Sequence, residues 1–86
     1  MKFEFDAAKS MSNLTKHGIG FNDAKQAWKD SKLLLIRATQ VIEERWIAIA
    51  SLKEKHWSVV FTYRGGRIRI ISARRSRARE IALYES

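Results

Sequence analysis

The stretch RIRIISARR, residues 67–75, sets the framework of the C-terminal half of this chain. Its isoleucines and arginines alternate, and a period of two predicts a β-strand. Two glycines at 65–66 come directly before it and predict a tight turn, because glycine adopts positive φ without steric cost. The run WSVVFTY at 57–63, which is rich in β-branched and aromatic residues, lies on the other side of the turn. We therefore expect an antiparallel hairpin formed by 57–63 and 67–73.

The two faces of the last strand differ in character. Because side chains alternate along a strand, the predicted faces are Ile68, Ile70 and Ser72 on one side and Arg67, Arg69 and Ile71 on the other. An unpaired guanidinium is very costly to bury, so helices should cover the isoleucine side and leave the other side partly open. The expected lining of this shallow basic concavity is Arg69, Ile71 and either Arg64 or Thr62, with Arg74 and Arg75 at its rim.

A pair of helices is predicted near the N-terminus. Asp6 can cap a helix that ends at Gly18, a residue suited to the left-handed conformation of a C-cap. The apolar stripe expected to face inward on this helix is Ala7, Met11 and Leu14, with Ala8 alongside. A second helix, DAKQAWKD, follows a short GIG link and is capped at or near Asn22. Its expected inward residues are Phe21, Ala24, Ala27 and Trp28.

The remaining elements complete an α+β fold. They are a possible short edge strand at 2–5, strands at 33–36 and 45–52, a loop or strand end at 37–44, a turn at 53–56 and a last helix at about 76–85. This order predicts an antiparallel sheet of about four strands, plus the possible N-terminal strand, with the αα-hairpin and the C-terminal helix packed on one face.

Length and composition restrict the possible classes of protein. The 86 residues predict a single domain spanning 1–86. No stretch approaches the roughly 18 uninterrupted apolar residues of a membrane span, and acidic residues occupy the start, where a signal peptide needs an apolar run. We therefore expect a cytoplasmic protein with no membrane partner. The chain has no cysteine, which excludes disulfides and thiolate metal sites.

The charge is strongly positive and unevenly distributed. Seventeen Lys and Arg against nine Asp and Glu give a formal net charge of +8. Such an excess favours nucleic acid, an anionic membrane surface or an acidic protein as partner. Seven of the nine arginines fall between Arg64 and Arg79, and the only acids after His56 are Glu80 and Glu85. Since guanidinium makes bidentate contacts with phosphate and carboxylate, this run predicts an anion-binding surface more than an ordinary solvated one.

The last helix presents titratable groups on one face. Glu80 and Tyr84 are four residues apart, and Arg77 stands three residues before Glu80. Glu80 can balance Arg77 or Arg75 in an exposed ion pair, or it can supply an acid or base beside the phosphate-binding arginines. His17 is explained by a helix C-terminus, and His56 is expected to be exposed in a turn. No metal-ligand spacing and no phosphate-binding loop is present, so we expect no metal and no cofactor.

These groups fit the needs of RNA cleavage without a metal. The 2′-OH must lose a proton, the phosphorane must be stabilised and the 5′-oxygen must gain a proton. Positioned arginines can stabilise the phosphorane, and a Glu, His or Tyr can transfer the protons. From the residues alone, binding of RNA or DNA is supported and cleavage is a possibility.

Two long motifs resemble the BrnT toxin family. FEFDAAKSMSNLTKHGIGFNDAKQAW resembles the F-x-W-D-x-x-K-x-x-x-N-x-x-K-H-G-[IV]-x-F-x-x-A opening of that family, with Phe5 in place of the usual Trp. RGGRIRIISARRSRAREIALYE resembles its ending, R-x-x-x-I-R-I-I-S-A-R-[KR]-x-x-x-x-E-x-x-x-Y, and Glu44 and Arg45 resemble its central E-R pair. The resemblance covers essentially the whole chain.

The resemblance implies a RelE-like fold and a metal-independent endoribonuclease toxin that inhibits translation. It also implies a BrnA-like antitoxin, whose ribbon-helix-helix part binds operator DNA and brings the complex to it. The catalytic residues it implies are Arg64, Arg69, Arg74, Glu80 and Tyr84. We further expect Arg67, Arg75 and Arg77, from the same run of arginines, to bind RNA. The general base stays open between Glu80, Glu44 and His17, and the motif with Asn13 and His17 can equally be structural. The alternative function is a non-catalytic basic module that binds the antitoxin, as a co-repressor, or nucleic acid.

Overall fold

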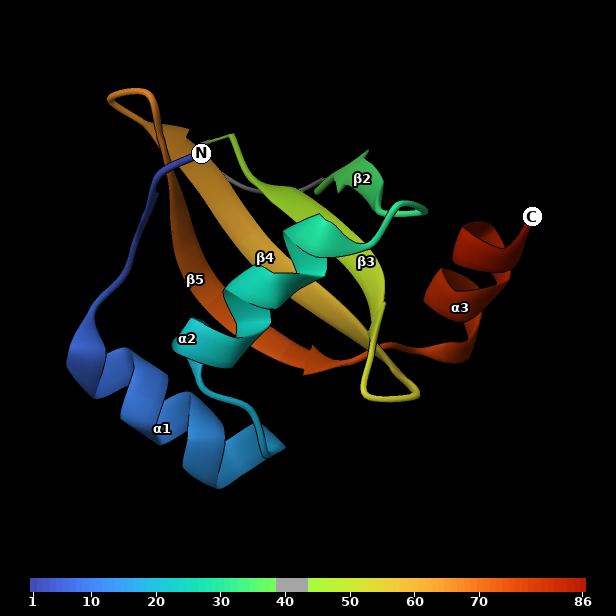
Figure 1. Cartoon of the computed structure of the whole chain (residues 1–86), viewed down its shortest axis with the longest axis horizontal. Coiled ribbons are helices and arrows are strands. Elements are labelled where there is room, and N and C mark those ends of the chain that lie inside the picture. Colours follow the sequence, from blue (N-terminus) through green and yellow to red (C-terminus); the bar gives the residue numbers. More distant parts are fainter. Residues whose placement is uncertain (39–43) are drawn as a thin grey trace.

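The predicted hairpin forms the centre of a five-stranded mixed sheet (Figure 1). The structure is a computed structural model and describes residues 1–38 and 44–86. The elements in chain order are β1 (Phe3–Glu4), α1 (Ala7–His17), α2 (Phe21–Ala24), the 3-10 helix η1 (Lys25–Lys29), β2 (Leu34–Arg37), β3 (Trp46–Leu52), β4 (Lys55–Arg64), β5 (Arg67–Arg75) and α3 (Ala78–Glu85). The α+β class is confirmed. Of the predicted loop or strand end at 37–44, residues 39–43 lie outside the described part of the chain.

The strand order is β1-β5-β4-β3-β2, and the pairing corrects one prediction. We expected antiparallel pairing throughout, but β1 runs parallel to β5, with Phe3 opposite Ile68 and Glu4 opposite Arg69. β1 runs parallel to β5 because the helix that follows it, α1, packs beside the far end of β5. The chain leaves β1 beside the start of β5 and enters α1, where Asn13 bonds Ala73 near the end of the same strand. β1 and α1 therefore follow β5 in one direction.

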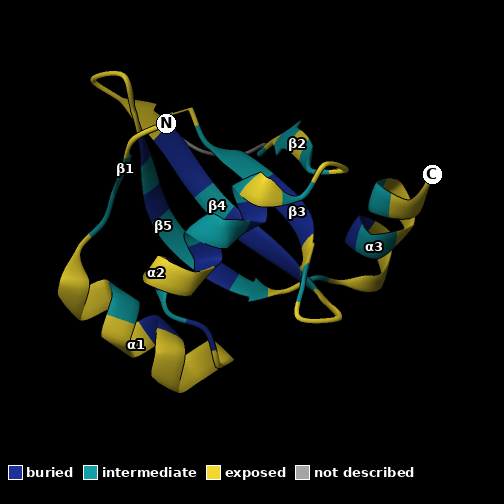
Figure 2. Ribbon diagram, viewed as in Figure 1, coloured by how far each residue is buried: buried dark blue, intermediate teal, exposed yellow. Residues whose placement is uncertain are grey.

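The N-terminal helices cover the isoleucine face, as predicted. Figure 2 shows the buried residues gathered on the strands beneath α2 and η1. Phe21, Ala24 and Ala27 point into this core, and Trp28 is half-buried against Phe61 at a ring-centroid distance of 5.0 Å. The second predicted helix is shorter than expected, because α2 has four residues capped by Gly20 and continues as η1. Nevertheless its inward residues are those that the sequence indicated.

The termini of α1 are as predicted, but its orientation is not. Asp6 accepts hydrogen bonds from the N–H groups of Ala8 and Lys9, and Gly18 ends the helix at φ 79°. The predicted inward stripe is exposed, since Met11 is 67% and Leu14 48% accessible. The helix instead packs through polar side chains.

Asn13 is the buried residue of α1. Its side-chain amide donates to the carbonyls of Ile19 and Ala73, both at 2.8 Å, and its oxygen accepts from the N–H of Ala73 at 3.2 Å. The carbonyl and N–H of Ala73 on β5 thus receive their hydrogen bonds from a side chain and not from a neighbouring strand. This need for a partner explains why a polar residue faces inward here. Ser10 supports the same contact by accepting from the N–H of Phe21 at 2.8 Å.

A β-bulge changes the faces of β5. The register passes from Phe61 opposite Ile70 to Val60 opposite Ser72, so Ile71 is an extra residue without a partner on β4. Strict alternation therefore ends at Ile70, and Ala73 joins the buried core in place of Ser72. The prediction that Ser72 lies on the core side and Ile71 on the arginine side does not hold.

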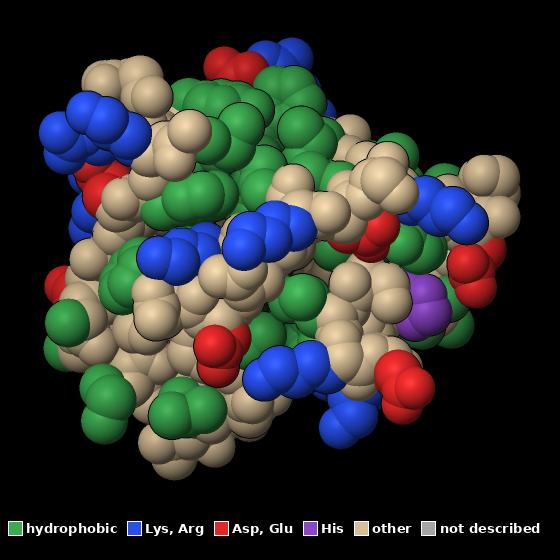
Figure 3. Space-filling model, in the orientation of Figure 1, with side chains coloured by type: hydrophobic (Ala, Val, Ile, Leu, Met, Phe, Trp, Pro, Cys, Tyr) green, Lys and Arg blue, Asp and Glu red, His purple; other side chains and the backbone are tan. Residues whose placement is uncertain are grey.

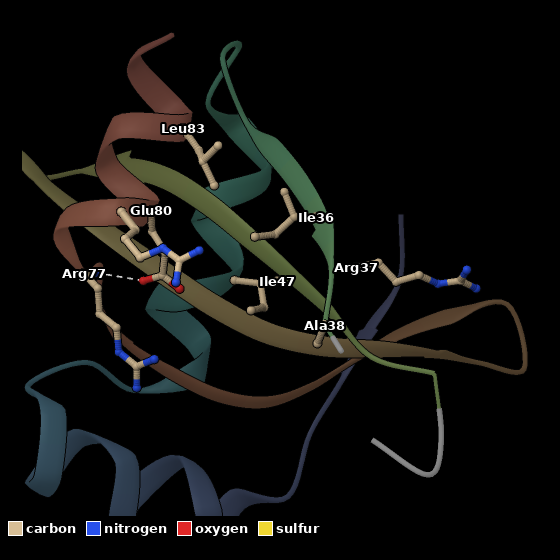
Figure 4. A pocket seen from close by; sticks show the side chains of 8 residues that line it. Ile36, Arg37, Ala38, Ile47, Arg77, Glu80 and Leu83 are labelled. Atoms are coloured by element: carbon tan, nitrogen blue, oxygen red, sulfur yellow. Dashed lines mark hydrogen bonds between the residues drawn. The ribbon is translucent and has the colours of Figure 1, made fainter. Parts of the chain in front are cut away.

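The last helix lies on the side of the sheet opposite to α1 and α2, as Figure 4 shows, so helices cover both faces and not one. Glu80 of α3 bonds Ser58, which with Ile49 is completely buried on that side. The contact is polar, because the half-buried Arg74 of β5, which pairs with Glu80, lies on this face opposite Ser58. No helix in the described part of the chain is long and apolar enough to span a membrane.

The N-terminal helices leave one end of their own face uncovered. Apolar side chains gather there in Figure 3. Tyr63, which is 54% exposed, contacts Trp46 and Phe61 edge to face. This apolar surface and the arginines described below lie on opposite sides of the sheet, because Tyr63 and Arg64 are neighbours on one strand.

Candidate functional site

Arginines from the β4–β5 hairpin share one face of the sheet. Arg64 stands opposite Arg67 and Thr62 opposite Arg69, so all four side chains project to the same side. We call these four residues the arginine face. Arg64 and Arg67 are exposed, Arg69 is half-buried and Thr62 is buried. The hairpin thus brings together Arg64, Arg67 and Arg69, as the sequence predicted.

Glu4 of β1 is the acid at this surface. Its carboxylate accepts from Arg69 at 3.1 Å and lies 3.8 Å from Arg67. The parallel pairing of β1 with β5 places Glu4 opposite Arg69. One carboxylate thus faces two guanidinium groups, and Arg64 has no ion pair with any described residue. The arginine face retains net positive charge.

Arg74 and Glu80 form a fork at the junction of β5 and α3. The guanidinium donates to both carboxylate oxygens at 2.7 and 2.8 Å, and the side chains are 22% and 11% exposed. Oε1 of Glu80 also accepts from the Ser58 hydroxyl at 3.1 Å and from the Arg77 N–H at 2.7 Å. The Arg77 bond closes the first turn of α3, as a capping-box glutamate does. Glu80 is therefore saturated with donors.

These donors change the acidity of Glu80. The hydrogen bonds from Arg74 are the largest cause, and they lower the pKa of the carboxyl from 4.5 to about 2 although burial opposes the shift. An acid with this pKa stays ionised at neutral pH and binds protons weakly. Catalysis by proton transfer is favoured by a pKa near the working pH. The environment of Glu80 favours a role in holding α3.

Tyr84 fixes the other end of α3. Its hydroxyl donates to Asp30 at 2.5 Å, and this bond is the main cause that raises the Tyr84 pKa to about 12. Burial raises the pKa of Asp30, but hydrogen bonds from the Ser51 N–H, Tyr84 and the Lys32 N–H outweigh it and lower the pKa overall. Contrary to the exposed position expected for it, His56 is half-buried, and its ring meets that of Tyr84 at 5.2 Å.

The other predicted site residues are dispersed. Glu44 is exposed and paired with Arg37, and its carbonyl accepts from Thr62 at 2.7 Å, so its backbone borders the arginine face. His17 ends α1, on the opposite side of the sheet. Arg75 lies over the ring of Trp57 at 5.7 Å and not beside Arg74 at the rim of the concavity. Arg77 begins α3.

Several residues of the site gave little signal in the sequence. Glu4, Ser58 and Asp30 form their bonds with partners 65, 22 and 54 positions away. The alternation of side chains along β1 and β4 was the only signal that could have shown on which side of the sheet Glu4 and Ser58 lie. Asp30 lies in a turn whose backbone bonds are local, and nothing in the sequence relates it to Tyr84.

The arrangement can bind a phosphate backbone. Guanidinium groups on one face of the sheet provide paired donors for phosphate oxygens and stay charged at neutral pH. They can also neutralise the charge that develops on a phosphorane. Within residues 1–38 and 44–86, no group of three or more His, Asp or Glu side chains is placed to hold a metal ion.

Comparison with known proteins identifies a family. A family model described as the ribonuclease toxin BrnT of a type II toxin–antitoxin system matches residues 5–80. The match includes both the helical pair and the arginine-bearing hairpin, and it ends at the glutamate of the α3 fork. A comparison with curated proteins found no match.

Proposed function

Since the chain belongs to the BrnT family of ribonuclease toxins of type II toxin–antitoxin systems, we propose that it is a metal-independent endoribonuclease and that its RNA-binding surface is the arginine face. The observation that carries this proposal is the alignment of Arg64, Arg67 and Arg69 on one side of the β4–β5 hairpin. Rigid donors aimed at one place stabilise developing charge without reorganisation.

The arginines have separate roles in this proposal. Arg69 and Arg64 contact the scissile phosphate and stabilise the phosphorane. Arg67 binds a flanking phosphate, and Glu4 keeps Arg67 and Arg69 in place until RNA displaces it. Arg77, at the start of α3, contacts a neighbouring phosphate of a bound strand, whereas Arg75 lies over Trp57 on the opposite side of the sheet.

Arg74, Glu80 and Tyr84 are positioning residues in this proposal. The Arg74–Glu80 fork and the Tyr84–Asp30 bond attach the two ends of α3 to the rest of the fold. A carboxyl with a pKa of about 2 and a phenol with a pKa of about 12 are both far from neutral pH. Neither group is suited to exchange protons there.

Glu44 is proposed as the proton acceptor because the other candidates on this side of the sheet, Glu80 and Tyr84, are held in other bonds. Its backbone adjoins Thr62, and its exposed carboxylate pairs with Arg37, whose guanidinium lies over the Trp46 ring on the other side of the sheet. Exposed pairs contribute little, so a substrate can displace this one. His17 lies across the sheet from the arginine face and serves the structure of α1.

The partner proposed is a BrnA-like antitoxin. Membership of a type II toxin–antitoxin family supports an antitoxin as partner and RNA as substrate. The motif resemblance supports the finer assignments: a ribbon-helix-helix DNA-binding part in the antitoxin, binding of operator DNA through it, a RelE-like toxin fold, and inhibition of translation in the cytoplasm.

The proposal is tested by incubating the purified chain, free of antitoxin, with a long single-stranded RNA in excess EDTA. Cleavage with 5′-hydroxyl ends and cyclic or 3′-phosphate ends is expected, because attack by the 2′-OH expels the 5′-oxygen. If the chain binds RNA or antitoxin tightly and cleaves nothing, its arginines form only a docking surface.

A further inference from the structure

An open groove runs between α3 and strands β2 and β3. It encloses about 340 Å³, and its apolar lining comes from Ile36, Ile47 and Leu83. Figure 4 shows these side chains pointing toward one another across the gap without filling it. Leu83 is 50% exposed, which is unusual for a leucine on the inner side of a helix. We call this feature the α3 groove. It lies on the same side of the sheet as the arginine face.

Among the residues that the structure describes, the groove has cations at its rim and no available anion. Arg77 and Arg79 line it at the first turn of α3, and neither has an ion pair with any described residue. Glu80 also lines it, but its carboxylate is neutralised by Arg74. Arg37 points away from the groove toward Glu44. A ligand therefore meets an aliphatic floor beside two unpaired guanidinium groups.

This lining selects a class of ligand. The floor is aliphatic, and none of the lining residues is aromatic, whereas single-stranded nucleic acid is held by rings on which bases stack. A volume of this size accepts one or two apolar side chains, and unpaired guanidinium groups pair with carboxylates. Apolar anchors within a charged rim are typical of protein–protein interfaces.

We propose that the α3 groove binds an acidic amphipathic segment of the antitoxin, an inference that rests on the proposed function as a toxin. An apolar side chain of this segment enters between Leu83 and Ile47, and its carboxylates pair with Arg77 and Arg79.

An antitoxin segment bound in the α3 groove would inhibit RNA binding because the groove lies close to the arginine face. Ile47 pairs with Val60, two residues from Thr62 of the arginine face. Strand spacing therefore separates the groove floor from Arg69 by roughly 12 Å. A bound acidic segment lies beside the RNA surface and repels phosphate from it.

The test compares two groove variants with two matched controls. Leu83→Gln removes the exposed apolar anchor, and Met11→Gln does the same on α1, where Met11 is 67% exposed. Arg79→Glu reverses an exposed charge in the first turn of α3, and Lys9→Glu does so in the first turn of α1. The ligand is the antitoxin encoded beside this chain, purified and titrated into each variant by calorimetry. Circular dichroism and thermal unfolding verify that each variant is folded.

Each groove variant is expected to weaken antitoxin binding about tenfold or more, while each control stays within about twofold. Cleavage of RNA without antitoxin should be unchanged in all four. Unchanged antitoxin affinity in both groove variants overturns the inference, as does absence of antitoxin binding by the parent chain. Loss of RNA binding in the groove variants also overturns it and assigns the groove to RNA. If the parent chain cleaves no RNA but the groove variants lose the antitoxin, this inference stands and the ribonuclease proposal fails.

Discussion

The guanidinium of Arg74 and the carboxylate of Glu80 are joined by two parallel hydrogen bonds, and both side chains are largely removed from water. Glu80 is the buried residue of α3, so this helix is attached to the sheet by a polar contact and not by an apolar face. Because Leu83 stays half exposed, the attachment of α3 depends on this fork and on the bond of Tyr84 to Asp30.

Removal of Arg74 should destabilise the protein strongly. Arg74→Met leaves the Glu80 carboxylate buried without its main partner, and we expect a loss of about 3 kcal/mol in the free energy of unfolding. Urea unfolding measures this value. Arg79→Met is the matched control, since Arg79 is exposed in the turn of α3 that carries Glu80, and it should change stability by less than about 0.5 kcal/mol. Equal effects of the two substitutions would show that the fork does not anchor α3.

Stability should fall in acid because of Glu80. The folded pKa of about 2 lies below the ordinary 4.5, so the unfolded state binds the proton more readily. The contribution is complete above pH 4.5 and is lost as the pH falls toward 2, and the shift corresponds to about 3 kcal/mol. Unfolding midpoints measured from pH 6 to pH 2 should show this loss in the parent chain and a flatter profile in Glu80→Gln. Parallel profiles would contradict the low pKa.

Tyr84→Phe should lower the stability of the protein without changing the pH dependence of RNA cleavage. The substitution removes one hydrogen bond to a carboxylate, and we expect a loss of about 1–2 kcal/mol in the free energy of unfolding. Cleavage rates measured between pH 5 and pH 9 should keep the shape of the parent profile, because Tyr84 positions α3 and transfers no proton. If one limb of the profile disappears while the fold is intact, Tyr84 is an acid or base in the reaction.

Glu4→Gln should increase the affinity for RNA. The change frees Arg67 and Arg69 from the carboxylate that competes with phosphate. Exposed or half-exposed ion pairs are weak, so the dissociation constant should fall only about two- to fivefold. Fluorescence anisotropy with a labelled single-stranded RNA at several salt concentrations measures this effect. Glu54→Gln is the control for the change in net charge, since Glu54 is exposed in the β3–β4 turn. An equal increase in both variants would mean that net charge alone is responsible.

Local signals in the sequence predicted much of the fold. The Asp6 cap, the Gly18 stop and the Gly65–Gly66 turn all depend on residues adjacent in the chain, and all three are present. Alternation likewise separated Arg69 from Ile70 correctly, since both precede the bulge.

Long-range contacts account for the predictions that were wrong. The exposed stripe of α1 is apolar, yet Asn13 faces inward because the backbone of Ala73, 60 positions away, needs a hydrogen-bond partner. The extra residue Ile71 carries no local signature and changes the face of every later position in β5. Arg75 was expected with Arg74 at the rim of the basic concavity, but it lies over Trp57. The pairing of Glu4 with two arginines depended on a parallel contact that the sequence did not indicate.

The most direct test of the ribonuclease proposal is the single-turnover rate of RNA cleavage in excess EDTA by Arg69→Ala and by Lys29→Ala. Arg69 is half-buried in the arginine face, whereas Lys29 is exposed on η1 across the sheet. Removal of one transition-state donor predicts a decrease of at least about 100-fold for Arg69→Ala, with Lys29→Ala close to the parent chain and both variants folded. Parent-like cleavage by Arg69→Ala would contradict the assignment of the arginine face as the catalytic surface.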